Sequence, residues 1–116
     1  IEKNPQALAL IRKNARDLGL KPTIIAGDFF RIAGLLARKN SQFDIIFIDP
    51  PYMDENQKDV LIRVASKSLL DQDGVAVVEH PKKSDLPEEI EGLVRTDTRK
   101  YGDTKLSFYE RHKEVE

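Results

Sequence analysis

Cysteine and tryptophan are absent from the 116 residues, and methionine occurs once. Without cysteine the chain has no disulfide framework, thiolate zinc site, cysteine-held iron–sulfur cluster or cysteine nucleophile, which fits a reducing cytoplasm. Long apolar runs are also missing, since none approaches the ~18 residues that cross a bilayer. An excess of charge is missing too, because 19 Lys and Arg stand against 20 Asp and Glu. The overall charge therefore gives no reason to expect a nucleic-acid partner, although local segregation of charge is still possible.

The composition that remains is that of one globular domain, with 40% hydrophobic and 34% charged residues. A chain of 13.2 kDa is expected to expose about 6,400 Å² when folded, out of roughly 19,000 Å² when unfolded. A core without disulfides or metal is therefore feasible. The two histidines and the scattered carboxylates show no recognisable ligand spacing, so we predict no metal site.

Three segments have helical patterns. Asn4-Pro5 supplies an N-cap followed by proline at the first helical position, and Gly19 ends the helix. Gly27-Asp28 begins a second helix, and a third is expected from about Asn56 to Leu70. Leu8, Ile11, Ala15 and Leu18 form one apolar stripe on the first helix, and the second helix carries Phe30, Ala33, Leu36 and Ala37 on one side. In the third helix, the residues expected to face inward are Val60, Leu61, Val64, Ala65 and Leu69.

Strand-forming sequence occurs at 23–26, 43–48, 75–78, 93–100 and 105–111. The segment 43–48 is almost continuously apolar, as in parallel strands that are covered on both faces. The last two segments flank Tyr101-Gly102-Asp103-Thr104, where Gly102-Asp103 suits a type II′ hairpin. These elements predict an α/β fold: a mostly parallel, doubly wound sheet with helices on both faces and an antiparallel C-terminal hairpin.

Several polar side chains follow the predicted strands directly. In a parallel α/β sheet, ligands bind beyond the carboxyl ends of the strands. The residues placed there are Glu2, Asp28, Asp49, Glu79 and His80. This edge of the sheet is therefore the predicted ligand site.

Asp49-Pro50-Pro51-Tyr52 carries the strongest chemical signal. Two prolines remove backbone donors, so the carboxylate of Asp49 and the carbonyl of Pro50 leave a corner that only accepts hydrogen bonds. Tyr52 adds a flat aromatic face. Such a corner suits an exocyclic amino group on a planar base, and holding both amine hydrogens directs the nitrogen lone pair at an electrophile such as a sulfonium methyl group.

The same residues resemble motif IV of class I S-adenosylmethionine-dependent amino methyltransferases. Ile1-Glu2-Lys3-Asn4-Pro5 is similar to motif II, and Gly27-Asp28-Phe29 is similar to motif III. The segment from Tyr101 to Tyr109 resembles the closing hairpin of RsmD-type enzymes, which methylate the N2 amine of one guanine in bacterial 16S ribosomal RNA. The resemblance covers essentially the whole chain and implies a Rossmann-like fold, S-adenosylmethionine as cofactor, and ribosomal RNA or a small-subunit particle as partner.

The resemblance also implies roles for individual residues. Glu2 would bind the ribose hydroxyls of the cofactor, Asp28 its adenine amino group, and the backbone N–H of Phe29 a ring nitrogen. Asp49 is also expected to contact the cofactor. Asp49 and the carbonyl of Pro50 would hold the target amine, while Tyr52 stacks on the target base. The residues expected to meet phosphates near the rim are Lys82, Lys83, Arg99, Lys100 and Lys105.

Motif I, a strand followed by a glycine-rich loop, has no counterpart in these residues. We therefore interpret residues 1–116 as one partial methyltransferase domain from a longer protein. The first strand would lie in the middle of the sheet, and the glycine-rich loop would hold the methionine end of the cofactor. The segment alone is expected to bind S-adenosylmethionine weakly and to be inactive.

The motifs leave other functions open. Motif IV does not separate guanine from DNA adenine N6 or a protein glutamine as acceptor. A phosphoacceptor receiver domain also ends its third strand in an aspartate, but the diproline removes the backbone donors that an acylphosphate needs. A non-catalytic binding module is a third alternative, against which the set of Glu2, Asp28 and Asp49 argues.

Overall fold

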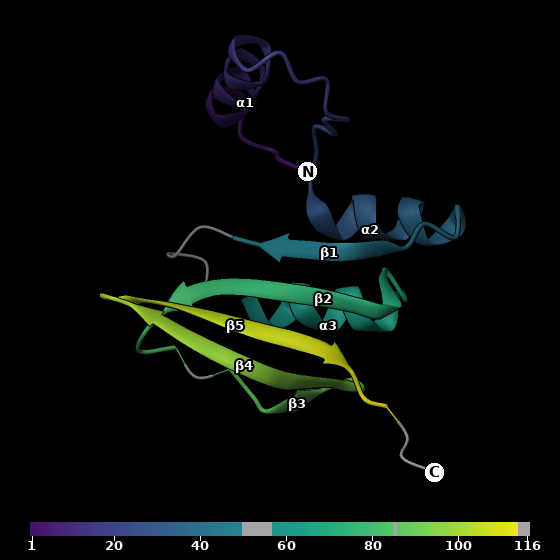
Figure 1. The fold of residues 1–116 in the computed structure, drawn as a ribbon. Coiled ribbons are helices and arrows are strands. Elements are labelled where there is room, and N and C mark those ends of the chain that lie inside the picture. Colours follow the sequence, from purple (N-terminus) through teal and green to yellow (C-terminus); the bar gives the residue numbers. More distant parts are fainter. Residues whose placement is uncertain (50–56, 85, 114–116) are drawn as a thin grey trace.

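The computed structural model describes residues 1–49, 57–84 and 86–113 (Figure 1). Its elements are α1 (Pro5–Asp17), α2 (Phe29–Arg38), β1 (Phe43–Ile48), α3 (Gln57–Ser66), β2 (Leu70–Pro81), β3 (Glu89–Ile90), β4 (Leu93–Tyr101) and β5 (Thr104–Arg111). The strands form one sheet in the order β1-β2-β5-β4-β3. The predicted α/β class is confirmed. The described sheet is mixed and not mostly parallel, because β1 pairs in parallel with β2 while the other described pairs are antiparallel.

One end of the sheet gathers the carboxyl ends of the parallel strands and the tip of the hairpin. Ile48 of β1 is level with Val78 of β2, and β5 runs antiparallel to both β2 and β4. The arrowheads of β1 and β2 therefore point toward the β4–β5 turn (Figure 1). Gly102 in that turn has φ +61°, as a type II′ turn requires at its first central position.

The helices begin where their capping residues predict. The Asn4 side chain accepts hydrogen bonds from the backbone nitrogens of Gln6 and Ala7 at 2.9 and 3.2 Å. The Asp28 side chain accepts from the nitrogen of Phe30 at 3.2 Å. These bonds satisfy donors that the first turn of a helix leaves unpaired.

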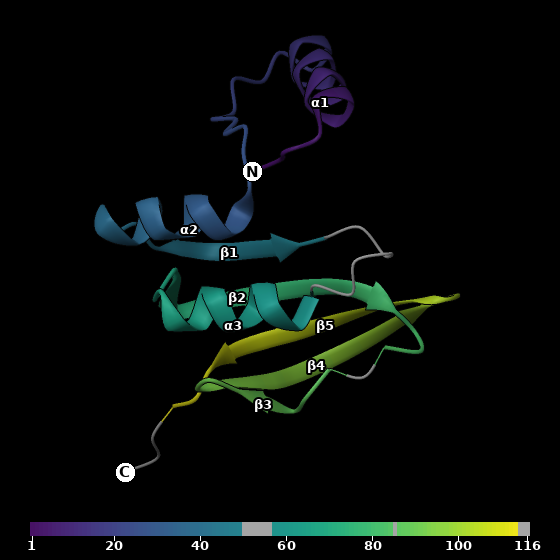
Figure 2. The same cartoon turned by 180° about the vertical axis from the view of Figure 1, so that it is seen from behind.

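The hydrophobic core lies between the sheet and α3, which crosses the rear of β2 in Figure 1 and the front of it in Figure 2. All five residues predicted to face inward from the third helix are buried: Val60, Leu61, Val64, Ala65 and Leu69. Leu93 and Tyr109 complete the core from the hairpin, and Phe29 and Phe30 pack against it from α2. The covered face of the sheet is thus held by α2 and α3.

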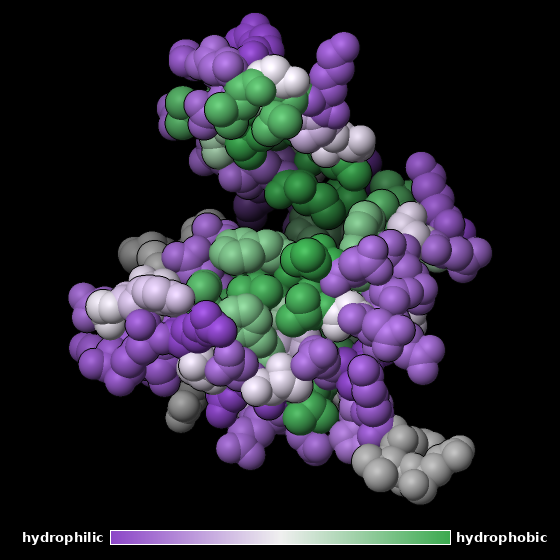
Figure 3. Space-filling view, viewed as in Figure 1, coloured by the Kyte–Doolittle hydropathy of each residue, from purple (hydrophilic) through white to green (hydrophobic). Residues whose placement is uncertain are grey.

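The opposite face of β1 is open, which corrects the prediction that this strand is covered on both faces. The side chains of Ile45 and Phe47 are 70% and 58% exposed. Figure 3 shows apolar side chains gathered on this face of the sheet. The apolar run predicted two covering layers, but the described chain supplies only one.

The segment Thr23–Ala26 is not a strand, contrary to prediction. It contributes a single isolated parallel bridge, between Ala26 and Glu2. Helix α1 follows Glu2 and stands apart from the sheet (Figures 1 and 2). A ladder needs a neighbouring strand along its length, and no described strand lies between this segment and β1.

Gly74 marks a close approach of β2 to β1. A Cβ atom there would lie 2.8 Å from the carbonyl oxygen of Asp44, at the place where the register of the two strands shifts between Phe43 and Ile45. A glycine is therefore required for the pairing that aligns the carboxyl ends.

None of the helices in the described residues has the length and apolar character needed to cross a membrane.

Candidate functional site at the carboxyl ends of the strands

Asp49 directly follows β1, and its side chain is exposed. Because Ile48 is level with Val78, the next residues of the two strands, Asp49 and Glu79, are neighbours at the end of the sheet. Pro50 and Tyr52, the other predicted contacts of the target base, lie outside the described residues. The structure therefore places Asp49, the first residue of the Asp49-Pro50-Pro51-Tyr52 segment, at the predicted edge of the sheet.

Glu2 and Asp28 are brought together by the isolated bridge. The backbone nitrogen of Glu2 donates to the oxygen of Ile25 at 3.1 Å, and the nitrogen of Gly27 donates to the oxygen of Glu2 at 2.9 Å. This pairing sets the Glu2 backbone beside Gly27, one residue before the N-cap of α2 at Asp28. Two carboxylates that are distant in sequence thus belong to one corner.

The chemistry of this corner is mainly that of an acceptor. One carboxylate oxygen of Glu2 accepts from the nitrogen of Lys3 at 2.9 Å, and Asp28 accepts from the nitrogen of Phe30. The remaining carboxylate lone pairs suit hydroxyl and amino donors. The N–H of Phe29, in the first turn of α2, has no carbonyl partner within its own helix. Together these groups fit a ribose diol and an adenine edge.

The described structure does not join this corner to Asp49 by any hydrogen bond or ion pair of the side chains. In Figure 1, the end of α2 where Asp28 lies is turned to the same side as the arrowhead of β1. The two predicted halves of the site therefore face a common side of the molecule, with no described strand between them.

His80 is a structural residue beneath this edge. It is 1% exposed, and its Nε2 lies 2.7 Å from the hydroxyl of Ser107 while its Nδ1 lies 3.1 Å from the carbonyl of Pro81. The carbonyl can only accept, so Nδ1 carries the proton and Ser107 donates to Nε2. Burial lowers the pKa of His80, and the positive charges of Lys105 and Arg95 lower it further.

Gln57 is a second polar residue that sequence patterns missed. It is the first residue of α3 and is 3% exposed, and its Nε2 has no hydrogen-bond partner among the described residues. Its position at the helix start gave no signal of burial. Ser107 was also missed, because a single polar residue in a strand is usually interpreted as one that faces solvent.

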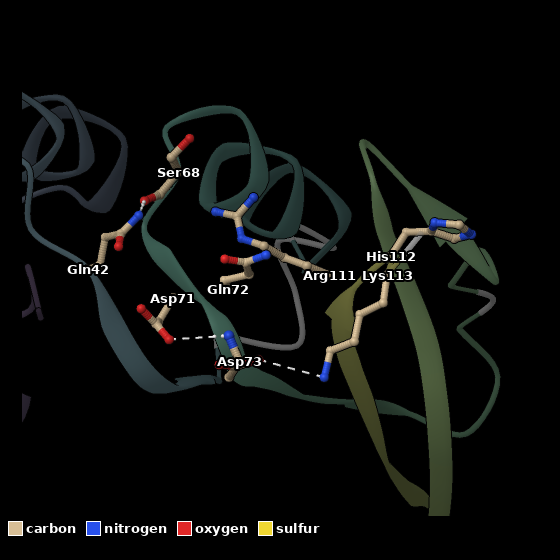
Figure 4. Close-up of a pocket in the computed structure, with 8 residues that line it drawn as sticks. All are labelled: Gln42, Ser68, Asp71, Gln72, Asp73, Arg111, His112 and Lys113. Atoms are coloured by element: carbon tan, nitrogen blue, oxygen red, sulfur yellow. Dashed lines mark hydrogen bonds and ion pairs between the residues drawn. The ribbon is translucent and has the colours of Figure 1, made fainter. Parts of the chain in front are cut away.

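A hollow of about 830 Å³ lies at the other end of the sheet. Figure 4 shows that its lining comes from the start of β2, from the end of β5 and the residues after it, and from Gln42 and Ser68. Its Arg111 guanidinium already donates to the carbonyl of Leu70, at 2.9 and 2.7 Å. This hollow lies away from Asp49, so it is not the predicted site.

The family comparison agrees with the positions of the motifs. A family model described as "Conserved hypothetical protein 95" matches residues 1–110. The chain belongs to this family. It is the RsmD family, as predicted from the sequence motifs.

Two similar proteins, one compared by sequence and one by structure, agree with the family model. A Bacillus subtilis protein named "Putative rRNA methyltransferase YlbH" is 28% identical over 113 residues, which cover 96% of this chain and 61% of the relative. A conserved hypothetical protein of Streptococcus pyogenes has a similar structure, with TM-score 0.85 and 29% identity over 95% of this chain and 68% of that one. The chain thus spans less than two thirds of the length of the curated relative.

A more distant structure shows the shared fold. The Escherichia coli protein named "Putative methyltransferase yhhF" has TM-score 0.73 and 18% identity, covering 93% of this chain and 59% of that one. The fold of this RsmD-family chain is therefore the Rossmann-like methyltransferase fold.

Proposed function

We propose that this RsmD-family protein transfers a methyl group from S-adenosylmethionine to the N2 amine of a guanine in 16S ribosomal RNA. The observation that carries the proposal is the exposed Asp49 at the carboxyl end of β1, followed in sequence by Pro50-Pro51-Tyr52. Membership of the RsmD family supports the choice of acceptor. The reaction would take place where ribosomal RNA is made, in the cytoplasm.

Glu2, Asp28 and Phe29 would hold the nucleoside part of the cofactor. The carboxylate of Glu2 accepts from the ribose hydroxyls, the carboxylate of Asp28 accepts from the adenine amine, and the N–H of Phe29 donates to a ring nitrogen. When bound, S-adenosylmethionine supplies an electrophilic methyl group on a sulfonium sulfur. These three residues would thus provide partners for the adenosine end.

Asp49 and the carbonyl of Pro50 would hold the two hydrogens of the target amine, with Tyr52 stacked on the base. Accepting both hydrogens aims the nitrogen lone pair at the methyl carbon. Transfer would form a nitrogen–carbon bond and break the sulfur–carbon bond to leave a thioether, and the Asp49 carboxylate would pass one amine proton to solvent. The acceptors act most strongly as positive charge develops on nitrogen.

We further propose that residues 1–116 are a partial domain, completed by a strand that pairs with β1 and a glycine-rich loop that meets the methionine end. The structure exposes 8337 Å², against about 6,400 Å² expected for a compact chain of this mass. Its radius of gyration is 14.9 Å, against about 13.4 Å for a compact domain of this length. The open face of β1 is where the additional covering would be placed.

The test is an Asp49→Ala variant of the full-length protein. Methyl transfer to small-subunit particles is expected to fall by about 100-fold or more, because the amine loses a charged acceptor. Asp44→Asn on the same strand is the matched control, since Asp44 is exposed and is given no role in the reaction. Transfer is measured with labelled S-adenosylmethionine, and the product nucleoside is identified by mass spectrometry.

The methylated product identifies the acceptor group. N2-methylguanosine would support the proposal, whereas N6-methyladenine or methylated glutamine would show that the acceptor is an adenine or a glutamine side chain. Full activity in Asp49→Ala would overturn the proposed role of Asp49 in holding the target amine.

A further inference from the structure

The tip of the β4–β5 hairpin carries a group of lysines beside the candidate site. Lys100 pairs across the hairpin with Lys105, which in turn is level with His80 of β2. Lys82 and Lys83 follow β2 and are exposed. Among the described residues, none of these four ammonium groups forms an ion pair. The backbone nitrogen of Lys82 donates to the oxygen of Asp103 at 2.8 Å, which fastens the tip to the exit of β2.

Charge is segregated along the hairpin. The start of β4, where β3 pairs with it, is flanked by the exposed acids Glu88, Glu89 and Glu91. At the tip the cations are in excess, and Asp97 is occupied by Arg99, whose Nε lies 3.3 Å from its carboxylate. The neutral overall charge of the chain therefore conceals a positive end and a negative end.

Tyr101 adds an exposed aromatic ring to the positive end. It is 58% exposed and directly precedes the turn at Gly102. By strand alternation it shares a face with Arg99, whose guanidinium lies 5.8 Å from the ring centroid of Phe108. Hydrogen bonding to Asp97 and then to Tyr101 raises the pKa of Arg99. Arg99 is thus paired with Asp97, while the four lysines form no ion pair among the described residues.

We propose that the hairpin tip is a binding surface for single-stranded RNA, with Tyr101 stacking on a base and Lys82, Lys83, Lys100 and Lys105 contacting phosphates. This inference rests on the proposed function, because it assigns a substrate contact to the same protein. Aromatic stacking beside a positive groove is the usual way in which proteins hold single strands without reading their sequence.

The geometry separates Tyr101 from the reacting base. β4 is three strands away from β1 in the sheet order, which corresponds to about 14 Å. Tyr101 pairs with Thr104, which in turn pairs with Pro81 of β2. Pro81 lies two residues beyond Glu79, the neighbour of Asp49, so Tyr101 is about 7 Å farther along the strand direction than Asp49. Tyr101 therefore takes a base that flanks the target, and the hairpin orients the strand while Asp49 holds the amine.

The experiment measures binding of a short fluorescein-labelled single-stranded RNA by anisotropy over a series of salt concentrations, using the protein with all of its encoded sequence. Tyr101→Ala is expected to weaken binding by about tenfold at every salt concentration, because stacking is lost. Tyr101→Phe keeps the ring and should bind as the wild type does. The double variant Lys100→Ser/Lys105→Ser should reduce the slope of log K against log salt by about 0.7 per lysine.

Lys67→Ser is the matched charge control, because Lys67 is exposed and follows α3 at the other end of the sheet. Circular dichroism verifies that each variant is folded. Wild-type affinity in Tyr101→Ala, equal weakening in Tyr101→Ala and Tyr101→Phe, or an unchanged slope in the double lysine variant would each overturn the inference. Such results with normal methyl transfer would leave the proposed function intact, whereas RNA binding without any methyl transfer by the wild type would overturn the function instead.

Discussion

At the scale of single residues, the best-defined polar contact near the candidate site is that of His80 with Ser107. The ring is buried, accepts from a hydroxyl at Nε2 and donates from Nδ1 to a carbonyl. Protonation would put the second hydrogen of the ring on Nε2, which would then lose its acceptor role toward Ser107, and it would place a charge in the core. The fold therefore requires the neutral form.

This requirement predicts a pH-dependent stability. The pKa of His80 is lowered from 6.5 in the folded protein, so the unfolded state binds more protons at mildly acidic pH. The contribution is complete above the unfolded pKa and is lost as the pH falls through the folded pKa. Between pH values of about 7.5 and 5.5, His80 should remove at most about 1.4 kcal/mol from the free energy of unfolding, a range in which most carboxylates stay charged.

Urea unfolding at the two pH values measures this loss. In His80→Asn the difference between the two pH values should shrink, whatever the absolute stability of the variant. His112→Asn is the control, because His112 is exposed and its removal should leave the difference unchanged. An equal pH difference in His80→Asn and the wild type would show that His80 is not the titrating group.

At the scale of elements, local chemistry predicted where the helices begin and where the hairpin turns, whereas α3 ends at Ser66 and not near Leu70, and β2 begins at Leu70 and not at Val75. Asn4, Asp28 and Gly102 act through bonds to their own neighbours in sequence, so their effects do not depend on the rest of the fold. The apolar spacing in α3 likewise predicted its buried apolar residues, because a helix has one covered face and a regular period, whereas the buried Gln57 was not predicted.

The strands were harder to predict, because a strand depends on neighbours that its own sequence does not specify. Thr23–Ala26 has strand-forming residues but gains only one bridge. The apolar run of β1 predicted cover on two faces, and one is open. The same limit applies to the site: the positions of Glu2, Asp28 and Asp49 followed from topology, whereas the burial of Gln57 and Ser107 depends on contacts across the sheet.

A matched pair of substitutions tests the two faces of β1. Ile45 is 70% exposed and Ile48 is 5% exposed, and both are β-branched residues of the same strand. Ile48→Thr should lower the free energy of unfolding by about 2 kcal/mol, because it buries a hydroxyl and loses core contacts. Ile45→Thr should change it by less than about 0.5 kcal/mol.

Chemical denaturation of the 116-residue chain measures both changes. Similar losses for the two variants would show that the face carrying Ile45 is covered in solution, for example by a second copy. The same pair in the protein with all of its encoded sequence gives the complementary result: if a further layer covers this face, Ile45→Thr becomes costly there.

At the scale of the whole molecule, the distribution of cofactor contacts predicts how the isolated chain binds ligands. Glu2, Asp28 and Phe29 offer partners for an adenosine, and the described residues offer no glycine-rich loop for the methionine end. The open edge of β1 leaves the corner of Glu2 and Asp28 supported by a single bridge. Both features lower affinity, the first by omitting contacts and the second by leaving ordering to be done on binding.

Isothermal titration of residues 1–116 should therefore show weak binding of S-adenosylmethionine, and adenosine should bind within about threefold of it, a difference of less than 1 kcal/mol. Asp28→Asn is the informative variant, because asparagine also caps a helix but replaces one acceptor with a donor; it should weaken both ligands equally without unfolding α2. Low-micromolar affinity for S-adenosylmethionine, together with a strong preference over adenosine, would mean that these residues already bind the methionine end. The interpretation of the chain as a partial cofactor site would then be wrong, while the acceptor chemistry of Asp49 would still stand on its own test.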